Sequence, residues 1–100
     1  MKNTLLLVST TLLVSSLSAD FFSDANKAYK NGDYKKTSEL MQKACDSENM
    51  RACWNLGLLY SNGRGVSRDE KKALSLYKTA CDGGNKNGCT SYEIFKGLSN

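Results

Sequence analysis

The chain has 100 residues, with 14 Lys and Arg, 10 Asp and Glu and no histidine, for a net charge of +4. The cations are spread along the sequence without a basic block, which argues against a nucleic-acid-binding protein. The lack of histidine excludes a Ser-His-Asp triad and the histidine ligands of most catalytic zinc sites. We therefore expect no metal site and no cofactor.

The first nineteen residues have the pattern of a secretory signal peptide. Lys2 precedes a run of apolar and hydroxyl residues, and Ala19 is followed by the acidic Asp20. The run is too short and too rich in Ser and Thr for a stable membrane span, which needs about 20 mostly apolar residues. We expect residues 1–19 to be cleaved and residues 20–100 to form one exported domain, either periplasmic or secreted. An uncleaved anchor is the alternative.

Apolar residues recur at helical spacing along the rest of the chain, and no alternating pattern of strand length occurs. Asn31-Gly32 is a typical helix end, and Asp33 and Asp69 are typical N-caps. Residues 61–68 are expected to form a loop. The expected helices are, in chain order, residues 20–30, 33–46, 49–60, 69–81 and 85–96.

The chain contains an internal repeat with a constant offset of 36 residues. Nine positions recur, among them Ala44-Cys45-Asp46 and Cys53, which return as Ala80-Cys81-Asp82 and Cys89. Periods of this length indicate a solenoid, in which one supersecondary unit stacks on the next. The expected fold is an all-α, right-handed α/α solenoid of about five helices.

Four cysteines in a short chain with an export signal indicate two disulfides. Cys45 ends one helix and Cys53 lies about one turn into the next, so an antiparallel helix pair sets them side by side. The repeat places Cys81 and Cys89 in the same relation. We expect the pairs Cys45–Cys53 and Cys81–Cys89. Zinc is the competing interpretation, but a spacing of eight residues is wider than that of usual zinc ligands.

Residues 56–66, with the sequence LGLLYSNGRGV, resemble the Sel1-like repeat, a relative of the tetratricopeptide repeat, as do the following Asp69, Lys72-Ala73 and Tyr77. The Ala-Cys-Asp segment with a cysteine eight residues later resembles the Helicobacter cysteine-rich protein family. This resemblance implies α/α hairpins tied by disulfides. It also implies a β-lactamase or penicillin-binding activity, which is described for members of that family.

The residues give little support to such an activity. Ser75 and Lys78 match the Ser-x-x-Lys element of serine β-lactamases, and Lys78-Thr79-Ala80 approaches the Lys-Thr-Gly element. One such match is expected by chance among the serines and lysines of this chain, and Ser75 lies in the middle of a predicted helix. A serine on the helix surface is the favoured interpretation, so no catalytic residue is assigned.

Arg51, Trp54 and Asn55 are the candidate binding residues. Arg51 and Asn55 lie one helical turn apart, and the resemblance to tetratricopeptide proteins implies that such a pair clamps a peptide carboxylate. Solvated polar residues are the alternative for this pair, and core packing is the alternative for Trp54.

The leading hypothesis is an exported, non-catalytic module that binds a protein, a peptide or a cell-wall ligand such as a β-lactam or a peptidoglycan-like molecule. A β-lactam hydrolase is the alternative hypothesis. The final predicted helix, residues 85–96, lacks a partner helix in the sequence. Self-association through this helix is therefore a further expectation.

Overall fold

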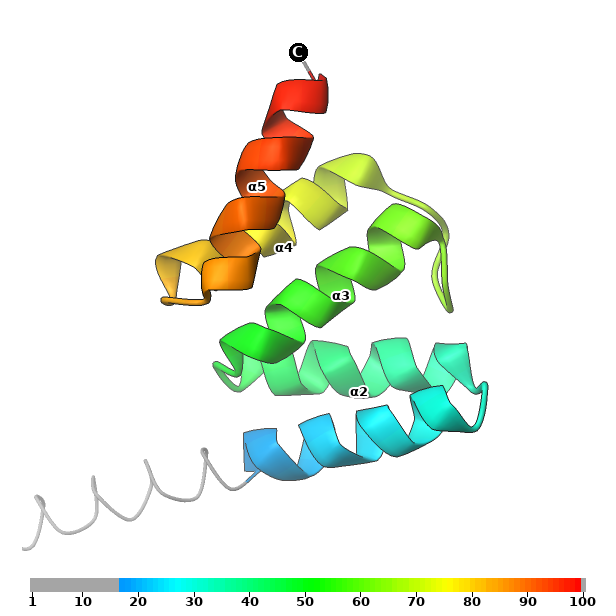
Figure 1. The fold of residues 1–100 in the computed structure, drawn as a ribbon. Helices are drawn as coiled ribbons and strands as arrows, with labels where there is room; N and C mark the ends of the chain where they lie inside the picture. The colour runs from blue at the N-terminus through cyan, green and yellow to red at the C-terminus, as the bar shows by residue number, and fades with distance from the viewer. Residues whose placement is uncertain (1–16, 100) are drawn as a thin grey trace, which may run out of the picture.

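The computed structural model describes residues 17–99, which form helices joined by turns and contain no strand (Figure 1). Each of the labelled helices packs mainly on its neighbours along the chain. The all-α solenoid expected from the repeat is confirmed. The elements are the opening helix (residues 17–30), α2 (Tyr34–Asp46), α3 (Met50–Asn62), α4 (Glu70–Asp82) and α5 (Lys86–Ser99).

Three helices extend beyond the ranges that the sequence pattern predicts. The opening helix already includes residue 17, and α3 and α5 continue past their expected ends. Helix α3 continues to Asn62. It ends there because Gly63 adopts the left-handed conformation (φ 64°), and the N–H of Gly63 donates to the carbonyl of Leu59. The loop therefore begins at Gly63 and not at Ser61. Helix α5 continues to Ser99, three residues beyond its expected end.

The same capping residues begin equivalent helices in both repeats. Asp33 and Asp69 each accept a hydrogen bond from the backbone N–H three residues later, at 3.1 and 3.0 Å. Asn49 and Asn85 do the same at the starts of α3 and α5, at 3.0 and 2.7 Å. Each cap satisfies a backbone donor that the helix itself cannot pair. The 36-residue repeat is thus a repeat of helix starts as well as of cysteines.

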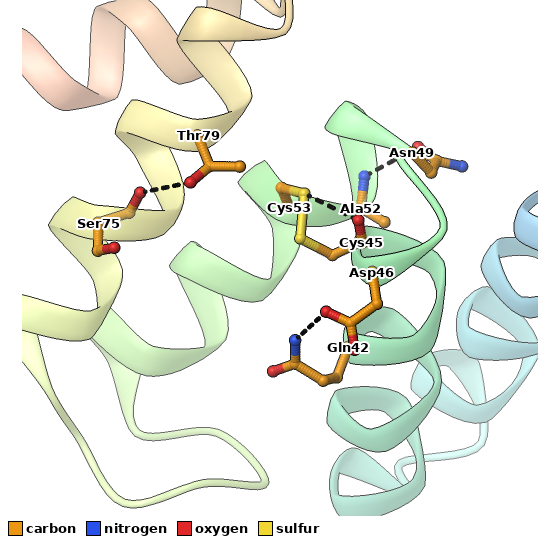
Figure 2. The surroundings of a disulfide bond; sticks show 8 residues. All are labelled: Gln42, Cys45, Asp46, Asn49, Ala52, Cys53, Ser75 and Thr79. Carbon is orange, nitrogen blue, oxygen red and sulfur yellow. Dashed lines mark hydrogen bonds between the residues drawn. A yellow bond between two sulfur atoms is a disulfide. The ribbon is translucent and has the colours of Figure 1, made fainter.

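Both predicted disulfides are present. Cys45–Cys53 joins the end of α2 to the start of α3, with Cα atoms 4.6 Å apart (Figure 2). Cys81–Cys89 joins α4 to α5 in the same way, with Cα atoms 4.4 Å apart. All four thiols are therefore used in covalent bonds, which contradicts the zinc interpretation. The two helix turns that they tie lie at one end of the molecule (Figure 1).

The core is built largely from alanines at the helix crossings and from a few larger side chains. Gly57 lets α4 approach α3 closely, because a Cβ atom there would lie 2.5 Å from Cε1 of Tyr77. Tyr77 is fully buried, and its hydroxyl pairs with Oγ of Ser61 at 3.1 Å. The largest fully buried side chains are Tyr77, Leu56, Thr37 and Cys53.

The loop between α3 and α4 folds back onto the first repeat. Gly65 lies against the start of α2, and its carbonyl accepts a hydrogen bond from Oγ of Ser38 at 3.3 Å. Nη1 of Arg64 donates to the hydroxyl of Tyr29 at 2.7 Å, and the guanidinium lies 5.1 Å from the ring centre of Tyr34. The loop thus fastens the second repeat to the first at the end opposite the disulfides.

Most of the predicted signal peptide lies outside the described residues. The predicted cleavage point after Ala19 falls in the first turn of the described part of the opening helix. Cleavage therefore stays a prediction. Within residues 17–99, no helix has both the length and the apolar character needed to cross a bilayer.

Candidate functional site

A hollow of about 240 Å³ lies where the opening helix, α2, α3 and the following loop meet. Its apolar lining comes from Met41, Leu58 and Leu59. The polar side chains that line it come from three helices and the loop: Asn26, Tyr29, Thr37, Asn55, Asn62 and Arg64. The hollow therefore combines apolar surface with several hydrogen-bonding groups, as binding sites commonly do.

The asparagine amides are the groups best suited to hold a ligand. An amide both donates and accepts hydrogen bonds, and Asn26, Asn55 and Asn62 bring three of them to one hollow. An extended peptide presents N–H and C=O groups alternately along its backbone, so such amides can pair with it. Asn55 is half-buried, whereas Asn26 and Asn62 are exposed.

Arg64 supplies a positive charge at the loop end of the hollow. Its hydrogen bond to Tyr29 and its position over Tyr34 hold the guanidinium in one place. The rings of Tyr29 and Tyr34 are themselves in contact, with centroids 5.3 Å apart. An arginine restrained in this way loses less side-chain entropy when it binds a ligand.

Of the three candidate binding residues, only Asn55 lines the hollow. Arg51 lies one turn nearer the start of α3, where its guanidinium stands 5.4 Å from the ring centre of Phe22. Trp54 is half-buried, and its Nε1 donates to Oγ of Ser91 at 2.9 Å, which joins α3 to α5. The predicted clamp of Arg51 with Asn55 is thus not assembled in this hollow. A binding role for Arg51 or Trp54 stays a prediction.

The sequence interpretation did not identify Asn26, Asn62 and Arg64 as site residues. Asn62 and Arg64 belong to the Asn-Gly-Arg-Gly segment that carries the family resemblance, so a signal for them was present. Residues 61–68 were expected to form a loop, and nothing in the sequence shows that this segment returns to the first repeat. Asn26 has no sequence signal of its own.

The Ser-x-x-Lys match lies on the surface of α4. Ser75 is exposed, and its carbonyl accepts a hydrogen bond from Oγ1 of Thr79 at 3.1 Å (Figure 2). Nζ of Lys78 pairs with Asp82 at 2.9 Å, and the hydrogen bond to this carboxylate raises the pKa of Lys78. A lysine that acts as a general base needs a lowered pKa. The geometry therefore does not activate Ser75.

Comparison with known proteins agrees with the repeat pattern and the fold. The model of the Sel1 repeat matches residues 51–85. HcpE of Helicobacter pylori is 45% identical over 49 residues, which are 49% of this chain and 14% of HcpE. HcpC of the same species is 44% identical over 45 residues, which are 45% of this chain and 16% of HcpC. The chain thus contains a Sel1 repeat, and over about half of its length it is similar to Hcp proteins.

The similarity covers only a small part of each relative. The aligned segment is less than a fifth of HcpE or HcpC, both of which carry a provisional β-lactamase designation in their names. A cytochrome c oxidase assembly factor 7 homologue of Drosophila melanogaster is also similar, at 44% identity over 39 residues, which are 39% of this chain and 15% of that protein. Relatives of such different designation are similar to this chain, so the similarity alone does not specify an activity.

Proposed function

We propose that this chain is a binding module that holds a segment of a protein or peptide in the hollow between the opening helix and α3. The observation that carries the proposal is the convergence of three asparagine amides and Arg64 on one hollow with an apolar lining. Sel1 repeats generally serve protein interactions, which agrees with this use of the hollow.

The proposal extends to where the module works and what it binds. Two disulfides are compatible with an exported protein, in the periplasm or outside the cell, because an oxidising compartment preserves them. A peptide that carries a carboxylate, or a peptidoglycan-like ligand with its peptide stem, would offer an anion to Arg64 and amide groups to the asparagines.

Selection from a displayed library of random twelve-residue peptides on the oxidised full chain tests the proposal. Enriched peptides are then synthesised, and their affinities are measured by isothermal titration calorimetry. We expect Asn55→Ala to weaken binding by roughly tenfold, the value of one or two hydrogen bonds in a partly buried site. The matched control is Asn87→Ala, which removes an exposed amide from α5.

Two results would count against the proposal. The first is a library that yields no peptide beyond those recovered on a reduced and alkylated sample. The second is a set of peptides whose affinity is equally insensitive to Asn55→Ala and Asn87→Ala.

β-Lactam hydrolysis is the second candidate function, and the designations of HcpE and HcpC are the observation that favours it. The exposed Ser75 and the ion-paired Lys78 do not support it. We expect the purified oxidised chain to hydrolyse a chromogenic cephalosporin no faster than a reduced and alkylated sample. Turnover that is lost in Ser75→Ala would instead establish this chain as a hydrolase.

Self-association through the last helix also belongs to the proposal. On α5 the side chains of Ile94 and Leu98 are 55% and 77% exposed. If α5 pairs with a second copy, sedimentation equilibrium will show a dimer that Ile94→Gln combined with Leu98→Gln dissociates. A monomer at all concentrations would remove this part of the proposal.

A further inference from the structure

The positive charge of the described chain is concentrated at the end opposite the disulfides. This end consists of residues 27–37 and 59–73, which contain the turn before α2 and the loop between α3 and α4 (Figure 1). We call it the basic end. It carries eight lysines and arginines against three carboxylates, for a net charge of +5. Its lysines are Lys27, Lys30, Lys35, Lys36, Lys71 and Lys72, all of them exposed.

The asymmetry remains when the boundary is moved. Extending the basic end by about one turn along each helix, to residues 24–40 and 56–76, adds Asp24 and Glu39 and leaves a net charge of +3. The rest of residues 17–99 then carries five cations and five carboxylates, and so is neutral. The charges are brought together because antiparallel helices return the chain to the same end twice.

The arginines and lysines of the basic end differ in their contacts. Arg64 is held by Tyr29 and Tyr34, and Arg68 forms an ion pair with Glu70. Within residues 17–99, the six lysines of the basic end form no ion pair, and Nζ of Lys72 lies 5.9 Å from the ring centre of Tyr60. The basic end thus presents mainly lysine ammonium groups, which are hydrated and carried on flexible side chains. It does not present a free guanidinium with the planar geometry that pairs with one carboxylate.

A single small anion does not fit this end well. A hollow of about 350 Å³ between the opening helix and α2 includes Lys27 and Lys36, but Asp24 and Asp33 line it as well. An anion bound there would face two carboxylates. The exposed lysines instead suit a partner whose negative charges are spread over a surface, where each cation near that surface adds to the attraction.

We propose that the basic end docks this protein on a membrane surface that contains anionic phospholipid headgroups. The attraction is electrostatic, so it weakens as added salt shortens the Debye length. Apart from glycines and Tyr29, the exposed residues of the basic end are polar or charged, so docking needs no insertion into the hydrocarbon layer. The proposal does not depend on what the hollow lined by Arg64 binds.

The test measures partitioning of the full chain onto vesicles by co-sedimentation. Vesicles contain either phosphatidylcholine alone or phosphatidylcholine with 30% phosphatidylglycerol, a composition chosen to be roughly that of a moderately anionic bilayer. The readout is the ratio of the two partition coefficients. The first nineteen residues are identical in the unmodified chain and in the variants described next, so binding through them does not distinguish one variant from another. We expect a ratio above roughly ten at 50 mM salt that approaches one at 300 mM salt.

Two variants with the same change in net charge make the test specific to one end. The first replaces Lys35, Lys36, Lys71 and Lys72 by Gln, and the second replaces Lys43, Lys78, Lys86 and Lys96 by Gln. Every one of these lysines is exposed, and circular dichroism verifies that both variants remain helical.

We expect the first variant to lose at least roughly tenfold in the ratio and the second to retain most of it. Equal losses in the two variants would show that net charge alone attracts the protein, and this would overturn the proposal. A ratio near one for the unmodified chain would also overturn it. If that chain instead bound polyglutamate through the same four lysines, its partner would be an acidic polymer and not a membrane.

Discussion

At the scale of single residues, two glycines have similar φ angles but differ in how much room their surroundings leave for a side chain. Gly32 and Gly65 have φ of 79° and 72°, values that side chains other than glycine rarely adopt. A Cβ atom on Gly32 would have no neighbour within 4 Å. A Cβ atom on Gly65 would lie 2.0 Å from the carbonyl oxygen of Tyr34. The loop can lie on α2 only because residue 65 has no side chain.

We predict that Gly65→Ala lowers the free energy of unfolding by about 3 kcal/mol or more, because backbone must move to relieve the clash. Gly32→Ala should cost only about 1 kcal/mol, the conformational penalty alone. Urea unfolding followed by circular dichroism measures both. Equal costs for the two variants would mean that the loop does not pack on α2.

The titration of Tyr77 is coupled to folding. Burial raises the pKa of Tyr77 above the ordinary value of 10.0, and the hydrogen bond to Ser61 offsets part of this effect. The folded state therefore holds the phenol proton more tightly than the unfolded state does. Its contribution to stability is complete below pH 10 and is lost as the pH rises from 10 through the raised pKa.

We predict that the free energy of unfolding declines above about pH 10 and that Tyr77→Phe reduces this decline. The variant should cost about 1 kcal/mol at pH 7, where the pair with Ser61 is lost. Chemical unfolding at a series of pH values gives both numbers, with Tyr92→Phe on the surface of α5 as the control. An alkaline decline that is unchanged in Tyr77→Phe would show that other groups cause it.

At the scale of elements, the two disulfides make the same connection between consecutive helices but differ in how deeply they are buried. Each closes an equally short loop between the end of one helix and the start of the next. Cys53 is fully buried, whereas Cys45, Cys81 and Cys89 are partly exposed. The Cys45–Cys53 disulfide therefore contributes to packing as well as to the restraint of the unfolded chain.

Replacing either pair by alanines should cost about 2–3 kcal/mol through the unfolded state. Loss of the Cys45–Cys53 pair should cost about 1 kcal/mol more, because a cavity replaces the buried sulfur of Cys53. Urea unfolding of the two double variants without reductant measures the difference. A larger loss for the Cys81–Cys89 pair would show that the attachment of α5, and not core packing, limits stability.

At the scale of the whole molecule, the array has inner and outer helices. Among the described residues, α3 and α4 each pack on helices to both sides, whereas α5 packs mainly on α4. On the opening helix, the partly buried Phe21 and Phe22 pack against the core. In such an array, stability is roughly the sum of contributions from each repeat and from the interfaces between neighbours.

We therefore predict that backbone amides of α3 and α4 exchange with solvent most slowly and that those of α5 exchange at least roughly tenfold faster. Hydrogen–deuterium exchange with mass spectrometry on the oxidised chain resolves the helices. Equal protection in all helices would show that the array opens as one cooperative unit.

The sequence by itself determined the local and periodic features of this protein. Helix starts depend on caps such as Asp33 and Asn49, and the disulfide pairs depend on the turn between adjacent helices. Each involves residues close in the chain, so the pattern carries enough information to predict it. The helix ends at Asn62 and Ser99 were predicted less well, because the regular spacing of buried apolar residues stops before the last turn of each helix.

Only the tertiary structure decided which polar residues meet. Arg51 and Asn55 are close in sequence, yet the hollow joins Asn55 to Asn26 and Arg64, which lie in other parts of the chain. The lysines of the basic end look evenly scattered in the sequence, and antiparallel packing gathers them at one end. Contacts between distant segments depend on how the helices stack and where the loop returns, and no short-range pattern encodes these.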